Sequence, residues 1–138
     1  METQEKPVWQ QFYEDGQGFH RTVKGSLKRP QVFTPELVQN IAAMGIEKYF
    51  MAMFTRRGLW PRNHTMDDLL TEAKTFIALP EDLESSLRSF DSFQFICSIE
   101  AIHISKPQPE DIRRFMDALD RIAVLAEQEL IRAADQGS

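Results

Sequence analysis

Apolar residues recur at spacings of three and four in five segments of the chain, which is the spacing of one face of an α-helix. The five segments cover residues 9–27, 34–57, 65–77, 81–103 and 109–133. Short connections join consecutive segments, and such connections favour antiparallel packing of neighbouring helices. The pattern therefore predicts an all-α fold, an up-and-down antiparallel bundle of about five helices.

The second segment has the clearest helix signals. Thr34 can cap its free backbone amides, Pro35 suits the first helical position, and Gly58 suits its exit. Its side chains are apolar nearly all round, apart from a thin polar stripe: Glu36, Asn40 and Glu47. Such a helix belongs in the centre of a bundle. The third segment opens at Thr65-Met66-Asp67-Asp68, which resembles a capping box with aspartate in place of the usual glutamate.

Two points of the pattern have alternatives. Gly16 falls on the apolar face of the first segment, so it either lets another helix approach closely or marks a break. Residues 93–104 alternate between apolar and polar over part of their length, as a strand would. However, Ile96 and Ile102 break the alternation, and a lone strand would leave its backbone groups unpaired. We therefore expect one long helix over residues 81–103.

Length and composition fit a single globular domain over residues 1–138, with flexible ends at 1–7 and 134–138. The chain has 138 residues, of which 42% are hydrophobic and 27% are charged. Its net charge of −5 weakens a nucleic-acid interpretation without excluding it, because phosphate neutralisation supplies most non-specific affinity. The one cysteine permits no intrachain disulfide, and we find neither a signal-peptide core nor a stretch of membrane-spanning length. We therefore expect a cytoplasmic protein.

The stretch Ala43–Met53, a short loop, and then the segment His64–Leu70 resemble the HEPN family, named for higher eukaryotes and prokaryotes nucleotide-binding. Members have a helix with a glutamate–lysine pair, a short polar loop, and a histidine–aspartate–leucine segment that opens the next helix. A further helix pair follows, often with a proline break between, as at residues 107–109 here. The resemblance extends over about residues 34–130.

This resemblance implies an all-α bundle that is often dimeric. It also implies association with nucleotides, with RNA, or with a nucleotidyltransferase encoded nearby. Some members are toxin ribonucleases, and their catalytic signature is an arginine followed five positions later by a histidine. The residues five positions before His20, His64 and His103 are Asp15, Leu59 and Ser98. The signature is absent, so ribonuclease activity is not carried over to any residue.

Five residues are candidates for a ligand site: Lys48, Arg56, Arg57, Arg62 and His64. Guanidinium groups bind phosphate bidentately, and the start of the next helix attracts anions, so the first interpretation is a phosphate or nucleotide site. In the alternative, the paired arginines complement a helix C-terminus and the histidine makes a local cap bond. Asp67 and Asp68 already occupy the positive end of that next helix, which counts against an anion there.

The remaining polar residues have simpler interpretations. Glu47 and Lys48 either line a pocket or dimer seam, or form the narrow solvent-facing edge of their helix. The basic run within residues 21–29 lacks the aromatic platforms of an RNA-binding strip and fits a solvated helix end. Cys97 has no basic neighbour to lower its pKa, so we expect a core residue, and His103 a core or interface residue. No metal-ligand spacing and no glycine-rich phosphate loop is present, so we expect no metal and no cofactor.

Three functions remain open. The first is a non-catalytic HEPN-like module that binds nucleotide, RNA or a nucleotidyltransferase-type partner and forms a homodimer. The second is a divergent ribonuclease with His64 or His103 as its general base. The third is a structural or regulatory dimeric bundle with no nucleotide link. The missing arginine–histidine signature favours the first.

Overall fold

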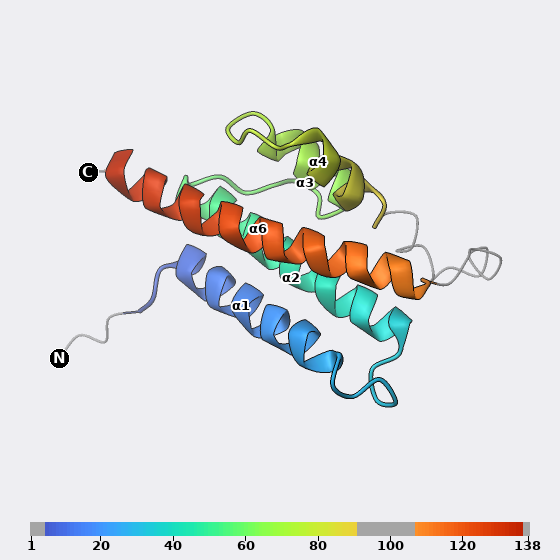
Figure 1. The fold of residues 1–138 in the computed structure, drawn as a ribbon. Helices are drawn as coiled ribbons and strands as arrows, with labels where there is room; N and C mark the ends of the chain where they lie inside the picture. Colours follow the sequence, from blue (N-terminus) through green and yellow to red (C-terminus); the bar gives the residue numbers. More distant parts are fainter. Residues whose placement is uncertain (1–4, 91–106, 137–138) are drawn as a thin grey trace.

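The fold is a bundle of helices, as the apolar spacing predicts (Figure 1). The computed structural model describes residues 5–90 and 107–136. Within these ranges the helices are α1 (Val8–Ser26), α2 (Pro35–Arg56), α3 (Met66–Ala73), α4 (Glu81–Arg88) and α6 (Pro109–Gln136). The described residues include no strand. The prediction of an all-α fold is confirmed.

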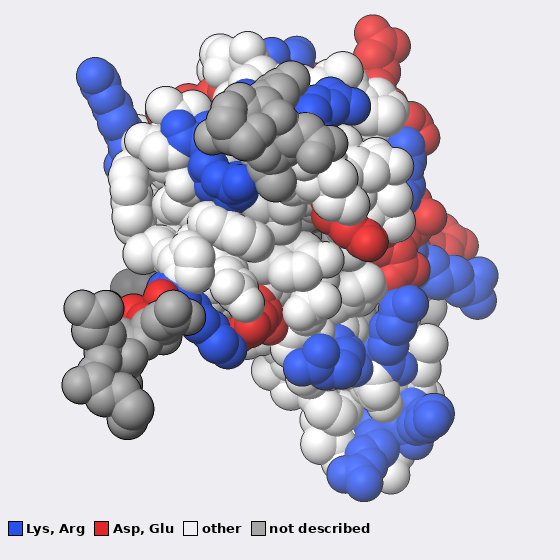
Figure 2. All heavy atoms as spheres, turned by 90° about the vertical axis from the view of Figure 1, so that its left-hand side faces the viewer, with Lys and Arg blue, Asp and Glu red and all other residues white. Residues whose placement is uncertain are grey.

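Three long helices form the body of the molecule. Figure 1 shows α1, α2 and α6 side by side, with the short α3 and α4 on the far side of α6 from α1. The helix α1 runs antiparallel to α2, whereas α2 and α6 run in the same direction. As a result, α1 begins at the end of the bundle where α2 and α6 finish, and Figure 2 views the molecule from that end.

The helix starts follow the predicted capping. The Thr34 hydroxyl oxygen accepts a hydrogen bond from the Leu37 amide at 3.2 Å. The Thr65 hydroxyl oxygen accepts one from the Asp68 amide at 3.2 Å and donates to the Asp68 carboxylate at 2.8 Å. These bonds satisfy amides that have no partner inside the helix. Gly58, with a φ of 74°, supplies the left-handed conformation at the exit of α2.

Two helix ends differ from prediction. The third helix ends at Ala73, not at Ile77, and the chain turns over the next three residues. The Thr75 hydroxyl donates to the Glu72 carbonyl at 2.7 Å, and the Phe76 ring packs edge-on against Phe54 at 5.2 Å. The local bond and the core contact together favour the turn over another helical turn. Likewise, α4 ends at Arg88, and the part of the predicted 81–103 helix beyond residue 90 lies outside the described residues.

The core is centred on α2, as its apolar sequence predicts. Eleven of its residues are buried, including Tyr49, Phe50 and Phe54. Two glycines let the long helices approach closely. A methyl group on Gly16 would lie 3.1 Å from the Tyr49 ring, and one on Gly45 would lie 3.1 Å from a Leu119 methyl group. Gly16 lies within α1, so it permits close approach and does not break the helix.

Candidate functional site

Two of the predicted ligand-site cations lie over aromatic rings of α1. The Lys48 ammonium lies 5.4 Å from the centroid of the Phe12 ring, and the Arg56 guanidinium carbon lies 5.3 Å from that of Trp9. Both distances fall within the range of cation–π attraction. The four side chains bring the start of α1 and the second half of α2 together at one end of the bundle.

A third ring extends this group into solvent. Trp60, in the loop between α2 and α3, is 64% exposed. Its ring meets the Phe12 ring edge-on, with 6.1 Å between centroids. We call the five residues the aromatic–basic surface: Trp9, Phe12, Lys48, Arg56 and Trp60. In Figure 2 this end of the molecule shows a broad uncharged area with both basic and acidic side chains around it.

His64 does not make the local cap bond of the alternative interpretation and instead contacts Glu47 of α2. Its Nδ1 lies 3.6 Å from a carboxylate oxygen of Glu47, and about half of its side chain is exposed. Thr65, and not His64, caps α3. Glu47, 31% exposed, therefore has a partner in the following loop, so it is more than a solvated helix edge.

Arg57 is separated from Arg56, its neighbour in sequence. Its guanidinium donates to the Glu129 carboxylate on α6 at 3.1 Å and lies 4.9 Å from the Phe76 ring centroid. Glu129 is only 4% exposed and also accepts from Arg132 at 3.1 Å. Because a buried carboxylate needs such partners, Arg57 stabilises the bundle and is not free for a ligand in this structure.

The start of α3 offers little to an anion. Asp67 and Asp68 lie in its first turn, and Arg88 of α4 binds both Asp67 and Glu84. Carboxylates thus occupy the positive pole of this helix. Arg62 is exposed in the loop that precedes α3. The five predicted residues therefore do not form one cluster, and only Lys48 and Arg56 join the aromatic–basic surface.

A second polar cluster joins three helices and was not anticipated from the sequence. His20 Nε2 lies 2.5 Å from an Asp120 carboxylate oxygen, and His20 Nδ1 lies 3.3 Å from the Tyr49 hydroxyl. A carboxylate can only accept, so Nε2 carries the proton and donates to Asp120, while Nδ1 lies within hydrogen-bonding distance of the Tyr49 hydroxyl. Burial raises the pKa of Tyr49 to about 12, so this hydroxyl keeps its proton well above neutral pH.

This cluster forms the inner wall of an open hollow of about 540 Å³ between α1 and α6. Lys24 reaches the same carboxylate of Asp120 at 3.5 Å. Both ring nitrogens of His20 are engaged, so it presents no free base to the hollow. The arrangement ties α1 to α2 and α6, and no sequence signal links its members because His20 and Asp120 are 100 residues apart.

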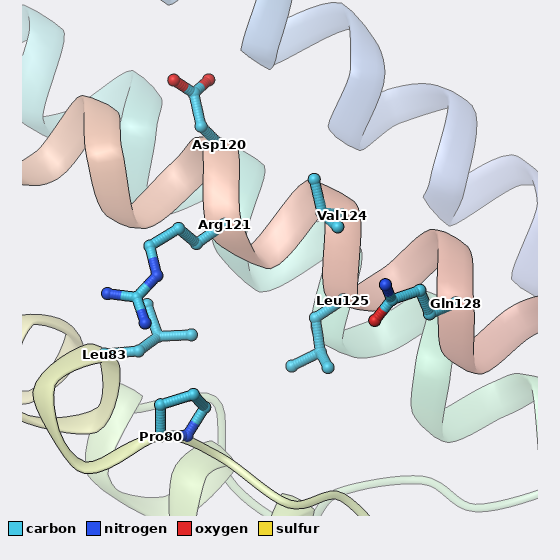
Figure 3. A pocket seen from close by; sticks show the side chains of 7 residues that line it. All are labelled: Pro80, Leu83, Asp120, Arg121, Val124, Leu125 and Gln128. Atoms are coloured by element: carbon cyan, nitrogen blue, oxygen red, sulfur yellow. The ribbon is translucent and has the colours of Figure 1, made fainter.

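An apolar pocket of about 340 Å³ lies between α4 and α6 (Figure 3). Arg121 and Leu125 extend from α6 toward Leu83 and Pro80, whereas Asp120 and Val124 project to the other side of the helix. The guanidinium of Arg121 is held by Asp82 at 2.7 and 3.2 Å. The walls of the pocket are therefore mainly apolar, and Gln128 is a polar side chain in the lining.

Cys97 and His103 lie outside the described residues, so their predicted core positions stay predictions. In the described part of the chain, no group of three or more histidine, cysteine, aspartate or glutamate side chains could hold a metal ion. None of the described helices has the length and apolar character needed to cross a membrane. No protein family, curated protein or solved structure that was compared matches this chain.

Proposed function

We propose that this chain is a non-catalytic, HEPN-like helical module that self-associates and binds a nucleotide or single-stranded RNA at the aromatic–basic surface. The observation that supports the ligand is the exposed Trp60 ring against Phe12, in a group where Lys48 lies over Phe12 and Arg56 lies over Trp9. A nucleotide presents a flat base and a phosphate, which match a ring and a cation respectively.

The energetics of such a surface suit a weak, salt-sensitive ligand. Stacking of a base on an aromatic side chain contributes roughly 1–3 kcal/mol. Lys48 and Arg56 can each neutralise a phosphate charge, and exposed Arg62 adds a third cation nearby in sequence. The local charge is favourable although the whole chain carries −5. We therefore expect binding at low ionic strength that weakens steeply as salt is added.

The contact between His64 and Glu47 supports the second candidate function, RNA cleavage. A carboxylate 3.6 Å from an imidazole nitrogen can orient the ring as a general base. However, the ribonuclease signature is absent, and His103, the other candidate base, lies outside the described residues. The same RNA used for binding tests this alternative, because cleavage that His64→Ala abolishes would establish it.

Fluorescence anisotropy with a labelled single-stranded RNA tests the proposal, and competition with unlabelled nucleotides separates a mononucleotide ligand from RNA. Trp60→Ala is expected to raise the dissociation constant about tenfold, because one stacking contact is lost. Arg62→Gln should weaken binding and reduce its salt dependence. Arg29→Gln, at an exposed arginine in the α1–α2 turn, is the matched control and should leave binding unchanged. Equal affinity of Trp60→Ala and wild type would reject the aromatic–basic surface.

A further inference from the structure

The central helix α2 has an apolar side that its neighbours in the described part of the chain do not fully cover. Leu37 and Met44 are 40% and 46% exposed, and Ile41 between them is partly buried. The spacings of four and three place all three on one side of the helix. This explains in part why the sequence of α2 is apolar nearly all round.

Helix α1 extends the same surface. Tyr13 and His20 lie on the side of α1 that lines the hollow against α6. Phe12 and Phe19 lie on another side, where they contact or approach Lys48 and Gly45 of α2. We call the resulting surface the outer face of α1 and α2: Val8, Phe12, Phe19, Leu37, Ile41 and Met44. Val8, Leu37 and Met44 are exposed and the other three are partly buried. Exposed apolar residues on two adjacent helices are typical of a protein–protein contact.

On the outer face, α1 carries acidic side chains and α2 carries the basic side chain of Lys48. A hollow of about 490 Å³ on this face is lined by Glu14 and Asp15 of α1 and by Lys48 of α2, and Glu14 already pairs with Lys6. Gly18 lies in the same lining, and an added methyl group there would meet only the tip of Arg21, at 3.9 Å. Helix α1 therefore supplies a negative charge, and α2 a positive charge, at the same height along the bundle.

We propose that the outer face of α1 and α2 is the interface between two copies of this chain, related by a two-fold axis along the seam between the two helices. This axis places α2 of the second copy over α1 of the first and keeps each residue at its own height. Lys48 of the second copy then faces Asp15, and Met44 of the second copy faces Phe19. Each contact occurs twice, as in any isologous dimer.

Complementarity favours a second copy as the occupant. The same patch carries an acid and a base at matching positions, so it is complementary to itself after the two-fold rotation. Most of the face is apolar, with the uncharged Asn40 exposed beside Leu37 and Met44, and this fits the depletion of charge in the middle of protein interfaces. The inference rests on the self-association proposed above and not on the ligand site. Trp9, Arg56 and Trp60 lie at the end of the bundle beside this face, whereas Phe12 and Lys48 belong to both surfaces.

Sedimentation velocity over a range of concentrations tests the interface. The wild-type chain is expected to dimerise. Met44→Glu should raise the dimer dissociation constant about 100-fold, because it places a carboxylate in the apolar centre twice per dimer. Val124→Glu on α6 is the matched control, since Val124 is 55% exposed and lies on another face. It should dimerise as the wild type does, and circular dichroism should show native helix content in both variants.

A charge-exchange experiment tests the register without altering the apolar centre. Asp15→Lys and Lys48→Glu should each be monomeric alone, because like charges then face each other twice across the axis. An equimolar mixture of the two variants should form a heterodimer with wild-type affinity, because both opposite-charge contacts return.

The outcomes separate the two claims. A wild-type chain that stays monomeric at all concentrations would refute self-association itself. A wild-type dimer that Met44→Glu leaves intact, or mixed charge variants that do not associate, would refute this interface and leave self-association standing. RNA binding is tested separately with Trp60→Ala, because Trp60 lies outside the proposed interface.

Discussion

Replacing Arg57 with alanine is expected to destabilise the fold strongly, although Arg57 was predicted from the sequence as a ligand-site residue. Its guanidinium is held between the Glu129 carboxylate at 3.1 Å and the Phe76 ring. Because Glu129 is 4% exposed, loss of Arg57 leaves a buried carboxylate with only Arg132, itself 61% exposed, as its described partner. The change therefore acts on a buried charge.

The magnitude follows from the burial of the two partners. Removing one member of a fully buried ion pair costs about 3–5 kcal/mol. Arg57 is 26% exposed and Arg132 remains, so the ionic part should be smaller, about 2 kcal/mol. The cation–π contact with Phe76 adds about 0.5–1 kcal/mol. We expect a total loss of roughly 2–3 kcal/mol in the free energy of unfolding.

Urea-induced unfolding, followed by circular dichroism, measures this loss. Arg62→Ala is the control, because Arg62 is exposed and a change there should cost no more than about 0.5 kcal/mol. The double variant Arg57→Met, Glu129→Leu should recover most of the lost stability, because it removes both charges together. A loss below about 0.5 kcal/mol for Arg57→Ala would refute the reasoning and return Arg57 to the candidate ligand residues.

Three further predictions concern packing and pH. Gly45→Ala brings a methyl group to 3.2 Å from the Phe19 Cβ and should cost about 1–3 kcal/mol in urea unfolding, whereas no change would mean that α1 and α2 separate easily. The pKa of Tyr49 is raised to about 12, above the ordinary tyrosine value, so folded stability should fall as pH rises from about 10 to 12. Thermal melts of Tyr49→Phe should show a smaller loss of stability over this pH range than the wild type. An identical loss would contradict the claim that burial of the Tyr49 hydroxyl causes it. Hydrogen bonding from Lys74 lowers the pKa of Glu84. The ionised Glu84 carboxylate therefore stabilises the fold above the ordinary glutamate pKa, and this stabilisation is lost as pH falls through the lowered pKa. Lys74→Met should reduce this acid-limb loss, and an unchanged acid limb would argue against the contact.

Local signals were sufficient for several elements of the fold. The start of α2 at Thr34 and Pro35 and the cap of α3 at Thr65 depend on bonds within a few residues, which a sequence displays directly. The end of α3 could not be predicted in the same way. It depends on Phe76 packing against Phe54, a contact that exists only after the chain has folded.

The candidate site was predictable only in part. Arg56 and Arg57 are adjacent in sequence, but neighbouring helical side chains point about 100° apart, so they reach opposite neighbours. Trp60 lies in a stretch whose sequence indicated only a short loop. Its position, exposed and edge-on to Phe12, depends on how that loop packs in the folded chain. The link from His20 to Asp120 spans 100 residues and could not be inferred from spacing.

The most direct test of the proposed function is the affinity of a labelled single-stranded RNA for the wild-type chain and for Trp60→Ala, measured by anisotropy at low salt. The proposal predicts that the wild type binds, that added salt weakens binding, and that Trp60→Ala binds about tenfold more weakly with its helix content intact. Failure of the wild type to bind RNA and to bind any competing nucleotide, or equal binding by both chains, would contradict it.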